Sequence, residues 1–260
     1  MEKLYPISEI FTSPQGEGQF AGCMMTFIRL AGCSVGKPFS KERYIKLSHC
    51  EFKCEDGDPD LGHGPNCAYA KSMYALPIYT EMCTLYDGRT FECDTDYRVK
   101  ERLSAEKIAE QIPNDITHVC ISGGEPFIHN LDELVKTVHH QRRFIQVHVE
   151  TSGTIHWNKA MPMLGPVVWI TVSPKFGILP EMVVRADEIK LLIDEDFSPA
   201  KLIQEIIDHE LVYIQPVNYE NRVNKKNLKL TLDWQKKYPN WRVSLQLHKA
   251  LEEFSGDRVR

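Results

Sequence analysis

The stretch THVCISGGEP, residues Thr117–Pro126, passes from an apolar run into two glycines and a carboxylate. Residues 117–122 have the β-branched and apolar composition of a buried strand. Gly123 and Gly124 have no side chains, so a ligand can approach the backbone closely, and the carboxylate of Glu125 can accept hydrogen bonds from a cation. The stretch therefore predicts a strand that ends in a polar turn open to a ligand.

Predicted strands and helices alternate from about residue 104, after a first strand near the N-terminus. Strands are expected over residues 25–30, 117–122, 144–150, 167–172, 188–194, 211–215 and 242–247, and helices over 105–112, 131–142, 198–208 and 225–238. Repeated β–α units with apolar strands are typical of a parallel sheet covered by helices. We therefore expect an α/β fold, a partial, open barrel of the TIM type with about six parallel β–α units.

Polar residues follow many of the expected strands at their carboxyl ends. They occupy residues 32–33, 123–126, 150–153, 173–175 and 215–216. Barrel-type α/β enzymes build their active sites at this face of the sheet, and open doubly wound sheets also bind ligands there. The sequence therefore predicts a site at the carboxyl ends of the strands. This position alone does not distinguish a barrel from an open doubly wound sheet.

The bulk composition is that of a soluble globular protein. The chain has 260 residues, of which 42% are hydrophobic and 26% are charged, so we expect residues 1–260 to form a single domain. A net charge of −5 provides no general attraction to nucleic acid or to an anionic membrane. No run approaches the roughly 18 apolar residues of a membrane span, and the N-terminus lacks the pattern of a secretory signal. These features predict a cytoplasmic protein that binds neither membrane nor nucleic acid directly.

The chain contains eight cysteines. In a reducing compartment, metal or cluster binding explains them better than a framework of disulfides. Cys23 and Cys120 lie in or beside apolar runs, and we expect them to be packing residues. The other six are candidate ligands.

Residues 48–72 interrupt the alternating pattern and are interpreted as a loop insertion rich in glycine and proline. They contain the candidate zinc ligands Cys50, Cys54, His63 and Cys67. The spacing Cys-x3-Cys-x8-His-x3-Cys has the number and types of ligands of a tetrahedral zinc site, which would stabilise a short loop. The alternative is a reduced, solvated loop without metal.

Further motifs lie along the rest of the chain. They are Glu9–Phe11 leading to Gln15–Gly18, Phe27–Cys33, Cys93–Asp96, the Gly-Gly-Glu-Pro turn, Glu150–Gly153, Val172–Lys175 and the tail Trp234–Lys249. Together they resemble radical S-adenosylmethionine enzymes, and within these the family of 7-carboxy-7-deazaguanine synthases. The resemblance covers nearly the full length except for residues 36–82, and Gln15–Gly18 together with the tail is its most specific part.

This resemblance implies an activity and its cofactors. The expected reaction is the ring contraction of 6-carboxy-5,6,7,8-tetrahydropterin to 7-carboxy-7-deazaguanine with loss of ammonia, in 7-deazapurine (queuosine-type) biosynthesis. The expected cofactors are a [4Fe–4S] cluster, S-adenosylmethionine as the source of a 5′-deoxyadenosyl radical, and Mg²⁺. The expected partners are the pterin substrate, a reductant such as flavodoxin or ferredoxin, and a second copy of the chain in a homodimer.

The resemblance also implies roles for individual residues. The ammonium end of S-adenosylmethionine would contact Gly123, Gly124 and Glu125, and its ribose and carboxylate would contact Glu150, Ser152, Ser173 and Lys175. The substrate would be bound by Gln15, Glu17, Arg29, Gln215, Gln246 and His248, and Mg²⁺ by Thr95. Arg29 offers a planar fork for a carboxylate, although a structural salt bridge is an alternative. His248 could instead be a core histidine at a strand end.

Three thiolates would hold three irons of the cluster and leave the fourth iron for the cofactor. The chain lacks the Cys-x3-Cys-x2-Cys run that is usual in these enzymes. The motifs around Cys33 and Cys93 favour Cys33 as the first ligand and Cys93 as the last. Cys83 is our choice for the middle ligand. The competing set combines Cys33 with Cys50 and Cys54.

Two other functions remain open from the sequence. A glycyl-radical activating enzyme would share the cluster and the cofactor but act on a protein, whereas Gln15–Gly18 and Arg29 favour a small carboxylated substrate. A metal-binding interaction protein would use the cysteine-containing insertion to dock another macromolecule. Formation of 5′-deoxyadenosine that depends on the pterin separates the synthase from both.

Overall fold

The computed structural model describes residues 2–35, 37–38, 80–93, 95–96, 98–142, 144–161, 168–218 and 223–255. The predicted insertion, residues 48–72, lies outside the described residues. Its candidate zinc ligands are Cys50, Cys54, His63 and Cys67. The zinc site and the competing cluster ligands Cys50 and Cys54 therefore stay predictions.

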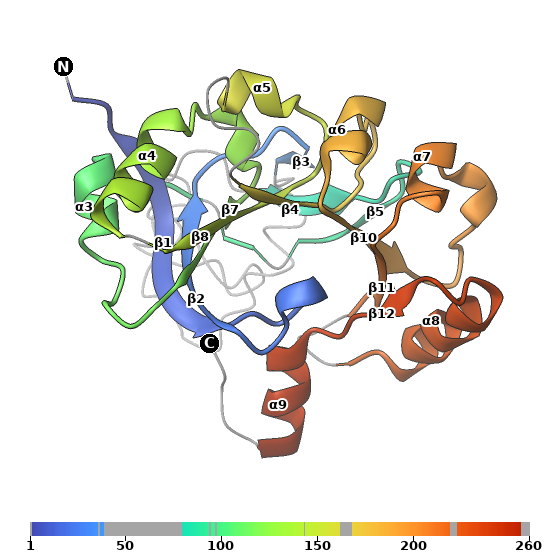
Figure 1. Cartoon of the computed structure of the whole chain (residues 1–260). Coiled ribbons are helices and arrows are strands. Elements are labelled where there is room, and N and C mark those ends of the chain that lie inside the picture. The colour runs from blue at the N-terminus through green and yellow to red at the C-terminus, as the bar shows by residue number, and fades with distance from the viewer. Residues whose placement is uncertain are drawn as a thin grey trace, which may run out of the picture.

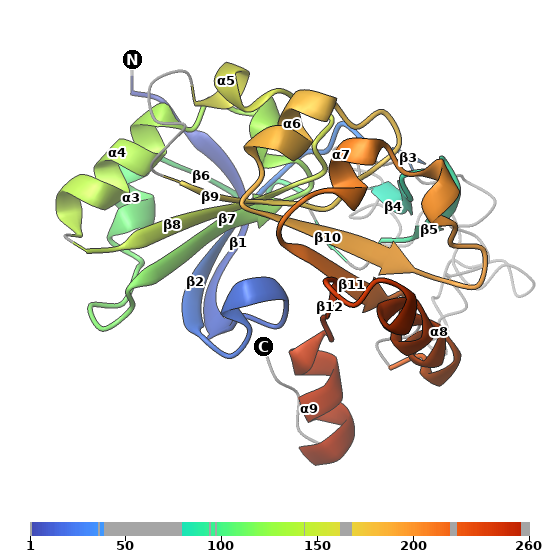
Figure 2. The same ribbon diagram turned by 45° about the vertical axis from the view of Figure 1, so that its right-hand side comes forward.

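In the described part of the chain, nine strands form one sheet in the order β12-β11-β10-β9-β8-β7-β2-β1-β6. Most of these strands are labelled in Figure 1, and Figure 2 also labels β6 and β9. Their bounds are β1 Tyr5–Pro14, β2 Met24–Leu30, β6 Glu101–Leu103, β7 His118–Gly123, β8 Gln146–Thr151, β9 Trp169–Val172, β10 Glu188–Ile193, β11 Val212–Pro216 and β12 Arg242–Val243. The strands from β2 through β7 to β12 are mutually parallel, whereas β1 runs antiparallel to β2 and β6. The predicted α/β class with a large parallel sheet is confirmed. Within these residues the end strands β12 and β6 do not pair with each other, so the sheet is open.

From β6 onwards, a helix follows each strand of the large sheet. Their bounds are α3 Ala105–Ala109, α4 Asp132–Gln141, α5 Trp157–Ala160, α6 Pro180–Arg185, α7 Gln204–Ile207, α8 Lys225–Lys237 and α9 Leu247–Ser255. Helices α4 to α7 follow one another along one side of the sheet, and α9 extends away from the body of the molecule (Figures 1 and 2). Among the described helices, none combines the length and the apolar character that a membrane span requires.

Alternation along the parallel strands separates the apolar core from the polar face. Ile121 of β7 and Val149 of β8 are fully buried and belong to the same cluster as Leu134 of α4. Successive side chains of a strand point to opposite faces, so Ser122 and Glu150, the next residues along β7 and β8, face away from this core. Both line a cavity on the other face of the sheet.

Two predicted elements are wrong in extent. Instead of one helix over residues 198–208, the chain forms a 3-10 turn at Pro199–Lys201 and then α7, because Leu202 and Ile203 between them have extended backbone with ψ of 148° and 152°. The strand predicted over residues 242–247 ends at Val243, and α9 begins at Leu247. The N–H of Leu247 donates to the carbonyl of Gly16 at 2.9 Å, so the tail is bound to the loop after β1 and does not continue along the sheet.

A second, smaller sheet carries one of the cysteines. In the described residues it has the order β3-β4-β5, with β3 Lys37–Pro38, β4 Thr80–Thr84 and β5 Thr90–Glu92. Cys83 of β4 pairs with Phe91 of β5, and both residues line the same cavity as the ends of the parallel strands. The β4–β5 hairpin therefore brings Cys83 to the polar face of the large sheet.

Candidate active site

A cavity of about 760 Å³ lies at the carboxyl ends of the parallel strands. The predicted substrate residues that line it are Gln15, Glu17, Arg29, Gln215, Gln246 and His248. The predicted cofactor and metal residues that line it are Gly123, Gly124, Glu150, Ser152, Ser173, Lys175, Cys33, Cys83, Cys93 and Thr95. Residues far apart in the sequence thus meet in one cavity, and Glu125 alone among the described candidates is not part of its lining.

The two glycines of the opening stretch are required by the neighbouring chain. Gly123 has φ of +129°, and a Cβ there would lie 2.0 Å from the carbonyl oxygen of Leu30. A Cβ on Gly124 would lie 2.1 Å from the oxygen of Gly32 and 2.7 Å from Cβ of Cys33. Such distances exclude any side chain. The glycines therefore let the end of β7 pack directly against the segment that carries Cys33.

Glu125 lies beneath the cavity and is 1% exposed. Its Oε1 accepts hydrogen bonds from the N–H of Phe127 at 3.1 Å and from Oγ1 of Thr151 at 2.7 Å. Its Oε2 accepts from the N–H of Ser152 at 2.8 Å and from the Ser152 hydroxyl. A buried carboxylate needs such donors. In this arrangement Glu125 orders the end of β8, which carries the cavity residues Glu150 and Ser152.

Three thiols approach the cavity from different segments. Cys33 follows β2, Cys83 lies in β4, and Cys93 follows β5. Burial raises the pKa of the Cys83 thiol, and the sulfurs of Cys93 and Cys33 act in the same direction, whereas the charge of Lys175 opposes them. Cys33 and Cys93 are thus close enough to Cys83 to affect its pKa, and all three thiols border the same cavity.

These three thiols are of the ligand type that holds an iron–sulfur cluster. Among the described residues, no three His, Cys, Asp or Glu side chains converge closely enough to bind a single metal ion. A [4Fe–4S] cluster does not require such convergence, because each thiolate binds a different iron. Cys23 and Cys120 do not line the cavity, and Cys120 is fully buried beside Met25 and Phe27, so its predicted packing role is confirmed.

Lys175 supplies a buried positive charge beside these thiols. It is 8% exposed, and its Nζ lies 5.0 Å from the centroid of the Phe91 ring. Burial lowers its pKa, while the neighbouring Cys83 favours the charged form. A cation over an aromatic face is attracted to the ring, so this contact ties the segment after β9 to the hairpin that carries Cys83.

The loop that follows β1 places Gln15 and Glu17 in the cavity. The N–H of Gln15 donates to the carbonyl of Cys23 and the N–H of Gly22 to the carbonyl of Gln15, both at 2.8 Å. The side chain of Gln15 donates from Nε2 to Oε1 of Glu150 at 3.1 Å and accepts from the N–H of Glu17 at 3.2 Å. Both residues are therefore fixed by protein contacts.

Lys190, in the middle of β10, was missed by the sequence analysis. Its Nζ donates to Oε2 of Glu17 and lies 3.9 Å from Oε1 of Glu150. Burial alone would raise the pKa of Glu17, but Lys190 and hydrogen bonds from Lys190, Gln215 and Gln246 lower it to about 2. Burial likewise disfavours a charged lysine, yet Glu150 and Glu17 raise the pKa of Lys190. The site thus holds one ammonium between two carboxylates.

Gln215, at the end of β11, has an unused acceptor. Its Nε2 donates to Oε1 of Glu17 at 3.0 Å. Its Oε1 is buried and has no hydrogen-bond partner among the described residues, although the residue is only 2% exposed. An unpaired buried carbonyl is costly, so this atom is suited to accept a hydrogen bond from a bound ligand.

Arg29 and His248, two further residues of the cavity lining, both have protein contacts. Nη1 of Arg29 is 3.6 Å from Oε2 of Glu9, and the guanidinium stacks 5.0 Å from the Phe11 ring centroid, with 31% of the side chain exposed. Arg29 thus has the salt-bridge partner that the sequence analysis allowed and still borders the cavity. His248 lies in α9 rather than at a strand end, and it packs against Gly16, where a Cβ would lie 2.8 Å from its Nδ1.

A relative of known activity matches nearly the whole chain. The chain is 31% identical over 252 residues to a 7-carboxy-7-deazaguanine synthase from Synechocystis sp., and the match covers 95% of this chain and 92% of the relative. The chain belongs to the 7-carboxy-7-deazaguanine synthase family. A member of this family from Escherichia coli is 27% identical over 258 residues, covering 95% of this chain and 98% of the relative.

The fold agrees with this family as well. The crystal structure of QueE from Escherichia coli aligns with a TM-score of 0.56 at 26% identity, covering 94% of this chain and 95% of that one. No protein-family model matches the chain. Membership in the synthase family therefore rests on relatives that extend over nearly the whole chain.

A sequence signal existed for Lys190, the site residue that was missed. It stands between Ile189 and Leu191 in an otherwise apolar strand. An unpaired ammonium is expensive in such a place, so a lysine there requires a carboxylate partner or a ligand. The partner carboxylates of Lys190 come from β8 and from the loop after β1, so they could not be recognised from local sequence.

Proposed function

We propose that this chain converts 6-carboxy-5,6,7,8-tetrahydropterin to 7-carboxy-7-deazaguanine with loss of ammonia, in queuosine-type 7-deazapurine biosynthesis. The observation that carries the proposal is the meeting of two residue sets in one cavity. One set is the thiols of Cys33, Cys83 and Cys93 with the glycine turn at residues 123–124. The other is the polar group around Glu17, Arg29 and the tail.

The second set matches the chemistry of a carboxylated pterin. The guanidinium of Arg29 would bind the substrate carboxylate through its planar fork. The carboxylate of Glu17 and the unpaired Oε1 of Gln215 would accept hydrogen bonds from the N–H groups of the pterin edge. Gln15, Gln246 and His248 would complete the contacts around the ring. Lys190 keeps Glu17 ionised and therefore able to accept.

The first set would bind the cofactors. Cys33, Cys83 and Cys93 would hold a [4Fe–4S] cluster, with S-adenosylmethionine between it and the strand ends. Its ammonium, carboxylate and ribose groups would be bound at the glycine turn and by Glu150, Ser152, Ser173 and Lys175, as the family resemblance implies. Glu125, also implied by the resemblance, would act through Ser152, whose N–H donates to it. When bound, the cluster and S-adenosylmethionine would supply the one-electron chemistry that begins the reaction. The buried walls of the cavity would exclude water from this chemistry.

Further parts of the proposal concern the setting of the enzyme. Thr95, which lines the cavity, is proposed as a ligand of Mg²⁺, and the insertion at residues 48–72 as a zinc site. We propose that the open sheet is a partial barrel, that the chain is one domain, and that it works as a cytoplasmic homodimer. A flavodoxin or ferredoxin would supply electrons.

Anaerobic reconstitution tests the proposed reaction. The full chain is loaded with iron and sulfide and mixed with S-adenosylmethionine, dithionite and the pterin. We expect 7-carboxy-7-deazaguanine by mass spectrometry and 5′-deoxyadenosine that accumulates only when the pterin is present. An Arg29→Met variant should retain the iron–sulfur absorbance and lose about 100-fold in product formation.

The other outcomes of this experiment select other functions. Formation of 5′-deoxyadenosine with a protein substrate but not with the pterin would favour a glycyl-radical activating enzyme. Absence of an iron–sulfur absorbance after reconstitution would reject both radical enzymes and leave a metal-binding interaction protein.

A further inference from the structure

The turn between the two hairpin strands contacts the segments that follow β9 and β10. It spans Leu85–Arg89 and joins β4, which carries Cys83, to β5, which is followed by Cys93. The N–H of Leu85 donates to the carbonyl of Arg89 at 2.7 Å, closing the turn. Gly88 packs on Phe176 of the segment after β9, where a Cβ would lie 3.1 Å from the ring. The hairpin is therefore anchored at its turn, close to Cys83 in the sequence.

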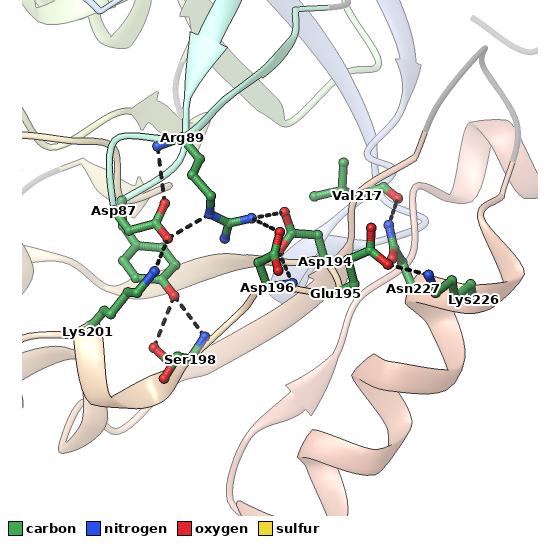
Figure 3. Close-up of polar contacts among 11 residues, drawn as sticks. Asp87, Arg89, Asp194, Glu195, Asp196, Ser198, Lys201, Val217, Lys226 and Asn227 are labelled. Carbon is green, nitrogen blue, oxygen red and sulfur yellow. Dashed lines mark hydrogen bonds and ion pairs between the residues drawn. The ribbon is translucent and has the colours of Figure 1, made fainter.

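Arg89 is the centre of this anchor. Its Nε donates to Oδ2 of Asp87 at 2.8 Å, and its Nη1 donates to Oδ2 of Asp194 at 2.6 Å, just after β10 (Figure 3). Asp196 lies 3.5 Å from the same Nη1, and Lys201 donates to Oδ2 of Asp87 at 3.0 Å. The carboxylates of Asp87 and Asp194 are only 4% and 12% exposed. The Arg89 side chain is 30% exposed, and charged hydrogen bonds to carboxylates this well covered are stronger than ordinary surface ion pairs.

Tyr86 adds an independent contact beside Arg89. Its hydroxyl donates to the carbonyl of Ser198 at 3.1 Å and accepts from the N–H of Ser198 at 3.2 Å. Its ring meets the Phe197 ring edge-on with the centroids 5.8 Å apart, and Phe197 in turn meets Trp234 of α8. The hairpin thus docks on the segment after β10 through both polar and aromatic contacts.

This docking has a direct consequence for the thiols. Cys83 and Cys93 lie far along the chain from Cys33, in contrast to ligands that share one short loop. Bringing together thiols that are far apart in the sequence costs conformational entropy, so contacts of the hairpin with the rest of the fold contribute to their placement. The strand pairs next to the turn are Thr84 with Thr90 and Cys83 with Phe91. Because these pairs connect the turn to Cys83, the position of the turn determines where Cys83 lies.

We propose that Arg89 is a positioning residue that holds Cys83 and Cys93 at the cavity before any cluster is assembled. Arg89 itself does not line the cavity, so it acts through the hairpin. The proposal rests on the proposed function insofar as these thiols are cluster ligands. The docking itself concerns the polypeptide alone and can be measured without a cofactor.

Thiol alkylation of the metal-free full chain tests the docking. The chain is treated with iodoacetamide, and the rate at each cysteine is followed by peptide mass spectrometry. With Arg89→Gln we expect alkylation of Cys83 to become at least about fivefold faster, because the hairpin opens more often. The rate at Cys120, fully buried in the core, should stay unchanged and report that the chain remains folded.

Lys226→Gln is the matched control. Lys226 pairs with Glu195, next to Asp194 in the same segment, but both side chains are mostly exposed at 71% and 62% (Figure 3). We expect wild-type alkylation at Cys83 in this variant. If Arg89→Gln also speeds alkylation of Cys120, the variant is partly unfolded and Asp194→Ala is tested in its place. Asp194→Ala removes one contact of Arg89 and leaves the hairpin sequence unchanged. The proposal is overturned if a variant keeps Cys120 protected and its alkylation rate at Cys83 equals that of wild type.

Reconstitution then connects the docking to the cluster. With limiting iron and sulfide, we expect Arg89→Gln to retain about fivefold less cluster than wild type, seen in the electron paramagnetic resonance signal of the reduced protein, and Lys226→Gln to match wild type. Equal cluster retention with faster alkylation would overturn the link to cluster binding. A wild-type chain that takes up no cluster would instead refute the proposed function, and the alkylation result would still stand.

Discussion

Lys190 and Glu17 are 173 positions apart in the chain, yet the ammonium of one donates to the carboxylate of the other inside the cavity. Their side chains are 8% and 14% exposed, and Glu150 is the second carboxylate near the same ammonium. A buried charge is tolerated only with such partners. The pair therefore fixes the loop after β1 on the parallel sheet and keeps Glu17 ionised.

Lys190→Met should damage both stability and activity. Without the ammonium, Glu17 and Glu150 lose their common partner, and breaking a buried pair costs about 3 kcal/mol of unfolding free energy. Because Glu17 would also leave its position, we expect product formation to fall by about 100-fold. Urea unfolding and steady-state turnover measure the two effects. Lys229→Met, on an exposed position of α8, is the control and should match wild type.

Gln215→Met should weaken substrate binding with little effect on folding. The variant removes the buried Oε1 that lacks a partner among the described residues, together with the donor to Glu17. We expect the dissociation constant of the pterin to rise about tenfold, the value of one lost hydrogen bond to a buried group. Calorimetric titration of the reconstituted protein measures it. An unchanged affinity would place the pterin elsewhere in the cavity.

Gly123→Ala should destabilise the chain much more than Gly22→Ala. Both glycines have positive φ, +129° and +89°, so both substitutions carry backbone strain. A Cβ at Gly22 meets no atom within 4 Å, whereas at Gly123 it would lie 2.0 Å from the oxygen of Leu30. We expect a loss of about 1 kcal/mol at Gly22 and about 3 kcal/mol at Gly123. Chemical denaturation measures both unfolding free energies. If the two variants lose similar amounts, the close packing of β7 on the segment before Cys33 is not required.

The stability of the chain should depend on His148 in mild acid. Burial and the neighbouring His118 lower the pKa of His148 to about 4, from 6.5. Between these two pH values the unfolded chain binds more protons than the folded one, so stability falls as the pH decreases from 6.5 towards 4. The shift corresponds to an upper limit of about 3 kcal/mol.

His148→Phe should reduce this pH dependence. The aromatic ring keeps the packing against Phe20, whose centroid is 4.6 Å away, but it cannot bind a proton. Thermal unfolding at several pH values in this window measures the difference. A pH dependence equal to that of wild type would mean that other groups, His118 among them, dominate the acid response.

Cysteine replacement should identify the cluster ligands. Replacement of Cys33, Cys83 or Cys93 by alanine is expected to abolish most of the iron retained after reconstitution, because each would leave one iron without its thiolate. Cys120→Ala is the control, since Cys120 is buried in the core and does not line the cavity. Retention by Cys83→Ala together with loss in Cys50→Ala and Cys54→Ala would support the competing set.

Much of the fold could be predicted from local patterns. Apolar strands such as 117–122 and 188–194 were recognisable because their side chains pack a core on one face. Strand β1 was missed, as were the break at Leu202–Ile203 and the end of β12. These features depend on partners that are distant in the sequence, such as β2 for β1 and the Gly16 carbonyl for the N–H of Leu247.

The sequence by itself determined the α/β class, the family and the residue types of the site, because strand periodicity and short motifs are local properties of the chain. Only the tertiary structure decided that Gly123 and Gly124 are needed for contact with Leu30 and Gly32, that Glu125 lies beneath the cavity, and that Lys190 belongs to the site. Steric exclusion and charge pairing act between atoms that are close in space, and folding alone brings those atoms together.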